Sequence, residues 1–95
     1  KDHQIKSLIV TGICTDICVL DFVLTCMSAI NHKIILPLKE IIVYSKACST
    51  YDMDIDDVKR LDLDEKMVHD QETYHNLGLK IMQMRGALIV NKITF

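Results

Sequence analysis

The chain has 95 residues, of which 49% are hydrophobic and 25% charged, and its formal net charge is −2. This composition is typical of one folded domain and excludes collagen-like and disordered chains. The basic residues are scattered among a slight excess of acidic ones, so we expect no nucleic-acid partner. The apolar runs 34–38 and 87–90 are far shorter than the roughly 18 residues of a membrane span, so we expect no membrane partner.

The cysteine pattern indicates a reducing compartment. The four cysteines are Cys14, Cys18, Cys26 and Cys48, and they lack the dense spacing of a secreted disulfide scaffold. No signal peptide precedes them, so we expect a cytoplasmic protein. The sequence opens at Lys1 rather than Met, and we therefore expect these residues to be a piece of a longer protein.

The first half of the chain predicts a strand followed by a helix. The apolar run 7–13, which contains Gly12, is typical of a strand buried on both faces. Thr15 or Asp16 is the expected N-cap of a helix that continues to residue 31. Its apolar positions, Phe22 and Val23 among them, should pack on the sheet. One narrow polar face remains, formed by Asp21, Thr25, Ser28 and His32.

The second half predicts two more strands and two more helices. A strand over 40–44 after a long helical crossover implies parallel pairing with the first strand. Residues 45–64 are polar and acidic, with a short helix over 55–61. Helical spacing over 70–85 predicts a second covering helix that ends at Gly86 and packs through Tyr74, Leu77, Ile81 and Met84. A strand over 87–90 completes an α/β domain with a parallel sheet.

The outer edge of the first strand has no obvious partner in this sequence. A strand that is apolar on both faces exposes an unpaired edge to other molecules unless something pairs with it. We expect the neighbouring strands to come from a missing N-terminal half, or from another copy of the chain in a homo-oligomer.

Cys18 is the strongest candidate for chemistry. It falls in the first turn after the strand-to-helix junction, where free amide N–H groups and the helix dipole favour thiolate over thiol. Ligands of open parallel sheets bind at this end of the strands. The alternative is that Cys18 is a small buried hydrophobic residue, as most free cysteines are. Cys14 could pack at the strand end, Cys26 should be core, and Cys48 could line the cleft or be structural.

No metal or nucleotide motif stands out. The cysteines form no C-x-x-C pair, and His69 and His75 are too far apart to share a helix face, so both are expected to be solvated. The acidic stretch 52–57 lacks the central Gly of a calcium loop and has Leu63 where the closing Glu belongs. We interpret it as a solvated loop that leads into a helix. Glycine-rich nucleotide motifs and G-x-S-x-G are absent.

The stretch 10–19, VTGICTDICV, resembles the nucleophile motif of the isochorismatase-like cysteine hydrolases, which include the nicotinamidases. The resemblance continues through 28–29, 31–32, 47–52 and 85–87, and residues 91–95 resemble the end of plant-type nicotinamidases. It covers the whole chain but only the C-terminal part of the family's single domain. It implies a three-layer α/β/α fold with a parallel sheet.

The resemblance also implies a reaction. Cys18 would be the nucleophile, and the backbone amides of Cys14 and Cys18 would form the oxyanion hole for hydrolysis of a small carboxamide, nicotinamide, to nicotinate and ammonia. The family's general base, its supporting Lys and its divalent metal, such as zinc, belong to the N-terminal half. We therefore expect no cofactor within this chain and little activity from it alone. The alternatives are a hydrolase of another small substrate and a non-catalytic assembly fragment.

Overall fold

The computed structural model describes residues 5–33 and 38–93. The three strands are β1 (Ser7–Gly12), β2 (Glu40–Cys48) and β3 (Leu88–Val90). The helical elements are a π-helical turn η1 (Thr15–Val19), α1 (Leu20–Asn31), α2 (Ile55–Arg60), a 3₁₀ turn η2 (Glu65–Met67) and α3 (Gln71–Met84). The α/β class predicted from the sequence is confirmed.

The strands form one parallel sheet in the order β1-β2-β3. Val10 of β1 lies opposite Val43 of β2, but Gly12 lies opposite Cys48, so the register shifts near the end of β1. β2 (Glu40–Cys48) is longer than the predicted 40–44. It pairs with β1 as far as Gly12, where the chain leaves the sheet toward the first helix. The predicted parallel pairing is confirmed.

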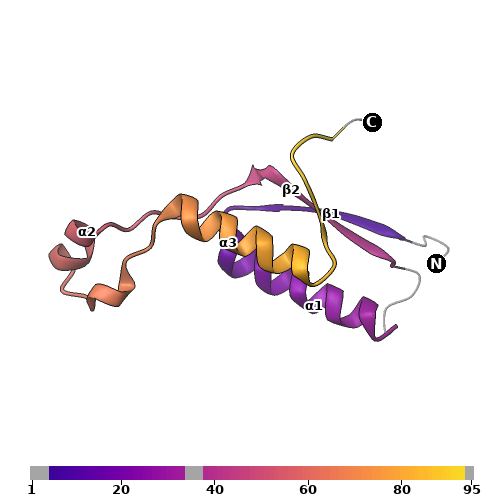
Figure 1. The fold of residues 1–95 in the computed structure, drawn as a ribbon, viewed down its shortest axis with the longest axis horizontal. Coiled ribbons are helices and arrows are strands. Elements are labelled where there is room, and N and C mark those ends of the chain that lie inside the picture. The colour runs from indigo at the N-terminus through magenta and orange to yellow at the C-terminus, as the bar shows by residue number, and fades with distance from the viewer. Residues whose placement is uncertain (1–4, 34–37, 94–95) are drawn as a thin grey trace.

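Helices α1 and α3 lie side by side on one face of the sheet (Figure 1). The core between them and the sheet is built from side chains with almost no exposure: Val23, Ile41, Val43 and Met82. Burying an aliphatic side chain of this size stabilises the fold by about 1.5–3 kcal/mol. No helix in residues 5–33 and 38–93 combines the length and the apolar character needed to cross a bilayer.

The prediction that the first strand is buried on both faces is wrong. β1 alternates, with Val10 facing the helices and Ile9 46% exposed on the opposite face. β1 is one of the two edge strands, and no described residue pairs with its outer side. Phe22, expected to pack on the sheet, is 49% exposed beside that edge. Both side chains lack a covering layer in the described part of the chain.

The predicted N-cap of the first helix is also wrong. Helical hydrogen bonding starts from Cys14, and no side chain caps the turn. Thr15 and Asp16 do not cap it because their side-chain oxygens bond to residues beyond β2, to Ser49 and Thr50 respectively. The first helix therefore opens with a π-helical turn instead of a capped α-helical one.

The late helix α3 differs from its prediction in the face it buries. Gly78 and Met82 are buried, whereas the expected core residues Leu77 and Met84 are 45% and 74% exposed. The buried face is set by the small Gly78, which lets α3 approach the turn η1 closely. Gly86 has a φ of 105°, so the predicted left-handed end of this helix is confirmed.

The segment between β2 and α3 projects from one end of the sheet (Figure 1). Helix α2 begins at a capping box in which Asp54 accepts from the Asp57 amide and Asp57 accepts from the Asp54 amide. The short helix predicted over 55–61 is confirmed, and the acidic stretch is the exposed loop that leads into it, with Asp56 and Asp57 in the first turn of α2. An antiparallel bridge between Met53 and His69 closes the base of the projection.

Gly78→Ala tests how tightly α3 packs on η1. A Cβ at Gly78 would lie 3.0 Å from the Asp16 Cα and 3.2 Å from the Thr15 carbonyl oxygen, both backbone atoms that cannot rotate away. Gly→Ala within a helix normally stabilises by about 1 kcal/mol, but here we expect about 1–3 kcal/mol of destabilisation from overpacking. Urea unfolding of the natural full-length protein measures it, and a gain in stability would contradict the close packing.

Candidate functional site

The turn between β1 and α1 is held by the end of β2. The Ser49 amide donates to the Gly12 carbonyl oxygen (3.1 Å), and the Thr15 amide donates to the Ser49 carbonyl oxygen (2.6 Å). The Thr15 hydroxyl donates to the same Ser49 oxygen (2.8 Å). Gly12 is required here because a Cβ would meet Val19 Cγ2 at 2.6 Å. Three hydrogen bonds therefore fix where the chain leaves the sheet.

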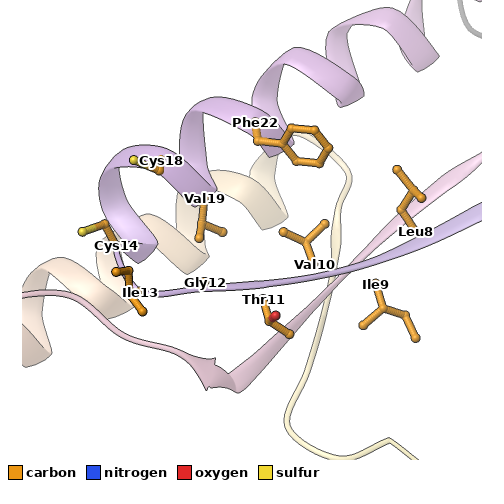
Figure 2. Close-up of a pocket in the computed structure, with 10 residues that line it drawn as sticks. All are labelled: Leu8, Ile9, Val10, Thr11, Gly12, Ile13, Cys14, Cys18, Val19 and Phe22. Atoms are coloured by element: carbon orange, nitrogen blue, oxygen red, sulfur yellow. The ribbon is translucent and has the colours of Figure 1, made fainter.

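Cys14 and Cys18 lie together on this turn, as the sequence predicts (Figure 2). The first π-helical hydrogen bond joins the Val19 amide to the Cys14 carbonyl oxygen. The Cys18 amide comes one residue before Val19 and therefore belongs to the first turn of the helix. Among the described residues, none accepts a hydrogen bond from the Cys14 amide. Cys18 is exposed and Cys14 half-buried. The turn thus presents an accessible thiol beside amide N–H groups at a helix start.

Both cysteines are among the residues that line one apolar groove, a cavity of about 530 Å³ along the outer edge of β1. Residues 8–14 line it from one side, and Cys18, Val19 and Phe22 line it from the helix (Figure 2). The thiols stand at the end of the groove where β1 passes into the turn. A ligand in this groove would contact apolar side chains along most of its length and the turn at one end.

The other two cysteines are buried. Cys26 and Cys48 belong to the hydrophobic core, and burial raises the pKa of both thiols, although a backbone hydrogen bond from Gly12 opposes the rise at Cys48. A buried thiol with a raised pKa is a poor nucleophile. The prediction for Cys26 is confirmed, and Cys48, for which the sequence left two roles open, is a core residue.

Asp16 connects the turn to two other segments. Its Oδ1 accepts from the Thr50 hydroxyl at 2.6 Å, and its Oδ2 lies 2.7 Å from His69 Nε2. His69 Nδ1 lies 2.8 Å from the Tyr51 carbonyl oxygen, which can only accept. Because both ring nitrogens lie against oxygen acceptors, these contacts fit an imidazolium paired with the Asp16 carboxylate.

The environment of His69 supports this charge. The ring is stacked between Tyr51 and Tyr74, with centroids 3.9 and 4.3 Å away, and the residue is 7% exposed. Burial lowers the pKa of His69, but the hydrogen bonds to Asp16 and Tyr51 and the charges of Asp16 and Asp52 outweigh it and raise the pKa above its ordinary value.

The contact between Asp16 and His69 lowers the pKa of Asp16, whereas it raises that of His69. Burial favours the neutral form of Asp16, yet the hydrogen bonds from Thr50 and His69 and the His69 charge keep its pKa below the ordinary value. The prediction that His69 is a solvated histidine is therefore wrong. Its sequence context is polar, and its burial comes from two tyrosines, Tyr51 and Tyr74, that precede and follow it along the chain.

His75 of α3 supports the turn from another side. The Thr15 hydroxyl already donates to Ser49, so it accepts at 2.7 Å from the Nδ1–H of His75. His75 is half-buried rather than fully solvated. Thr15 is wholly buried and thereby links β2, the turn and α3.

The described residues do not fit a metal site. No three His, Cys, Asp or Glu side chains in residues 5–33 and 38–93 come together as ligands. Asp16 and His69, the best donors near the turn, already bond to each other and to Thr50 and Tyr51. We therefore derive no step through a metal on these residues.

Comparisons with known sequences place the chain in a protein family. The isochorismatase domain model matches residues 1–90. The chain belongs to the isochorismatase family. It is 45% identical over its full 95 residues to "Nicotinamidase 1" of Arabidopsis thaliana. The chain spans only 38% of the length of that protein. No solved structure matches at a significant level.

In this isochorismatase-family chain, sequence reasoning missed the residues that hold the turn. Thr50 lies in the stretch 47–52 that carries part of the resemblance, which was the only signal for it. The helical spacing indicates that Tyr74 packs but not that it stacks on His69, and nothing near His69 in the sequence indicates its contacts with Asp16 and Tyr51, which are distant along the chain. Asp16 is one of the two predicted helix caps, but its side-chain contacts with Thr50 and His69 exclude that role.

The Asp16–His69 pair should make the free energy of unfolding decrease both when the pH is lowered and when it is raised. Asp16, with a lowered pKa, contributes above its ordinary value of 3.8 and loses this contribution as pH falls through its folded value. His69, with a raised pKa, contributes fully below its ordinary value of 6.5 and loses this as pH rises through its folded value. The pair is therefore strongest between these two values.

Asp16→Asn in the natural full-length protein tests this dependence. We expect a loss of about 1.5–3 kcal/mol of unfolding free energy in that window, the value of a hydrogen bond to a charged group. The loss should shrink at more acidic and more alkaline pH. Denaturant unfolding of both proteins across a pH series measures it, and a loss that is constant with pH would contradict the charged pair.

Proposed function

We propose that this chain carries the nucleophile of an amidohydrolase that releases ammonia from a small carboxamide such as nicotinamide. The observation that carries the proposal is the exposed Cys18, in the first turn of a helix at the carboxyl end of β1 and at one end of an apolar groove. The similarity to a nicotinamidase supports the choice of substrate. An apolar groove suits the flat ring of such an amide.

The reaction has two covalent steps. The Cys18 thiolate attacks the carboxamide carbon, forming a C–S bond and a tetrahedral oxyanion. Collapse breaks the C–N bond, and the nitrogen leaves as ammonia after taking a proton, which gives a thioester. Water then attacks the same carbon, the C–S bond breaks, and the products are the carboxylic acid and the regenerated thiol.

The turn supplies the electrostatic part of the catalysis. The amides of Cys14 and Cys18 are the donors that we assign to the oxyanion hole, because they belong to the first turn and the Cys14 amide bonds to no described residue. An oxyanion donor of this kind typically lowers the barrier by about 2.7–4 kcal/mol. Fixed amides need no rearrangement as the negative charge develops.

The proton transfers need a partner from elsewhere. Asp16 lies two positions before Cys18 in the sequence, but its carboxylate is already paired with His69. We assign the general base to parts of the natural protein outside these 95 residues, as the family resemblance implies.

Cys18→Ala in the natural full-length protein tests the nucleophile. We expect ammonia release from nicotinamide to fall by at least about 1,000-fold, since the covalent step has no substitute. Cys14→Ala is the matched comparison, because it removes a thiol from the same turn but keeps the amide. We expect it to lose less than about tenfold. Equal rates for Cys18→Ala and the unaltered protein would refute the assignment.

The isolated 95-residue chain tests where the base lies. Positioned acid–base groups contribute about 100–10,000-fold, so we expect the chain alone to hydrolyse nicotinamide at least about 100-fold more slowly than the full-length protein. A coupled ammonia assay at equal molar concentrations measures the ratio. Comparable rates would show that these residues contain the whole catalytic apparatus.

A further inference from the structure

We propose that Asp16 is a positioning residue of this site, and that its carboxylate, held between Thr50 and the His69 imidazolium, fixes the turn that carries the Cys14 and Cys18 amides. The inference deepens the proposed function and rests on it. Asp16 acts through the turn and not on the substrate, because each of its carboxylate oxygens already accepts a hydrogen bond.

The position of Asp16 in the turn is the first argument. It lies between the two cysteines, so any rotation of its backbone also moves their amides. Its two anchors come from separate segments: Thr50 follows β2, and His69 precedes α3. Two anchors on different segments restrain the turn against both sliding along the sheet and rotating away from α3.

The weakness of the turn itself is the second argument. η1 is one π-helical turn without a side-chain cap, and such turns are rare and often found at functional sites. Its backbone packs tightly against Gly78 of α3, where a Cβ would lie only 3.0 Å from the Asp16 Cα. The shape of the turn therefore depends on contacts with neighbouring segments, and Asp16 makes the charged contact, with His69.

The rigidity of His69 is the third argument. Both of its nitrogens donate, and both ring faces are covered by Tyr51 and Tyr74, so the imidazolium cannot rotate or leave without losing several contacts. The acidic groups whose charges act on it, Asp16, Asp52 and its own neighbour Asp70, all favour the cation. A fixed cation buried against a carboxylate is a rigid anchor for the turn.

Steady-state kinetics of Asp16→Asn in the natural full-length protein test the proposal. Asn retains the size of the side chain but loses its charge, and we expect kcat for nicotinamide to fall about 10–100-fold with KM nearly unchanged, as for a small misplacement of reacting groups. Asp21→Asn is the matched control, because it removes an exposed carboxylate from the adjoining helix α1. We expect it to keep full activity.

A second pair of variants separates positioning from general stability. Thr50→Val removes the hydroxyl and should lower kcat about tenfold, whereas Thr50→Ser retains the donor and should restore most of it. Each rate is divided by the fraction of folded protein, which circular dichroism measures. If Asp16→Asn and Thr50→Val lower the melting temperature but leave kcat per folded molecule unchanged, the contacts are only structural and the proposal is wrong.

A measurement without turnover distinguishes failure of this proposal from failure of the proposed function. Nitrogen-15 NMR of the His69 ring at pH 7 should show two protonated nitrogens in the unaltered protein and in Cys18→Ala. A neutral ring would overturn the Asp16–His69 anchor even if Cys18 is the nucleophile. A charged ring together with an active Cys18→Ala would instead refute the proposed function and, with it, the positioning role.

Discussion

The structure depends on one constraint, which is that a short turn without a side-chain cap must leave the end of β1 with Thr15 buried and Cys18 exposed. The turn has too few internal hydrogen bonds to do this alone. Its restraints come from far along the chain: Thr15 bonds to Ser49, 34 positions away, and Asp16 bonds to His69, 53 positions away. The local geometry of Cys14 and Cys18 is thus a product of the complete tertiary fold.

Reactivity and rigidity are divided between neighbouring residues of this turn. Cys18 is exposed, whereas Thr15 is wholly buried and Asp16 is only 12% exposed in its side chain. Burying polar groups costs free energy unless every one is bonded, and no buried side-chain nitrogen or oxygen in the described residues lacks a partner. A fully satisfied polar network can therefore specify one conformation where an apolar contact would allow several.

Much of the fold could be predicted from short-range patterns, and the site only in part. Apolar runs and helical spacing gave all three strands and the positions of the helices, because burial of one face imposes a period on the sequence. The junction at Gly12 gave Cys14 and Cys18. The sequence did not indicate the π-helical turn or the burial of His69, because both depend on partners such as Thr50 and Tyr74. The buried face of α3 was missed because the close approach at Gly78 shifts it.

The unpaired edge of β1 and the apolar groove are the same feature of the molecule. Residues 8–14 line the groove from the outer side of that strand, and Ile13, at its end, is 84% exposed. An edge with this much apolar surface is unfavourable in water, since both its backbone groups and its side chains gain from being covered. Any segment that pairs with β1 must therefore form the opposite wall of the groove. A strand added to this edge would therefore extend the sheet and, by the same pairing, cover the groove that ends at Cys14 and Cys18.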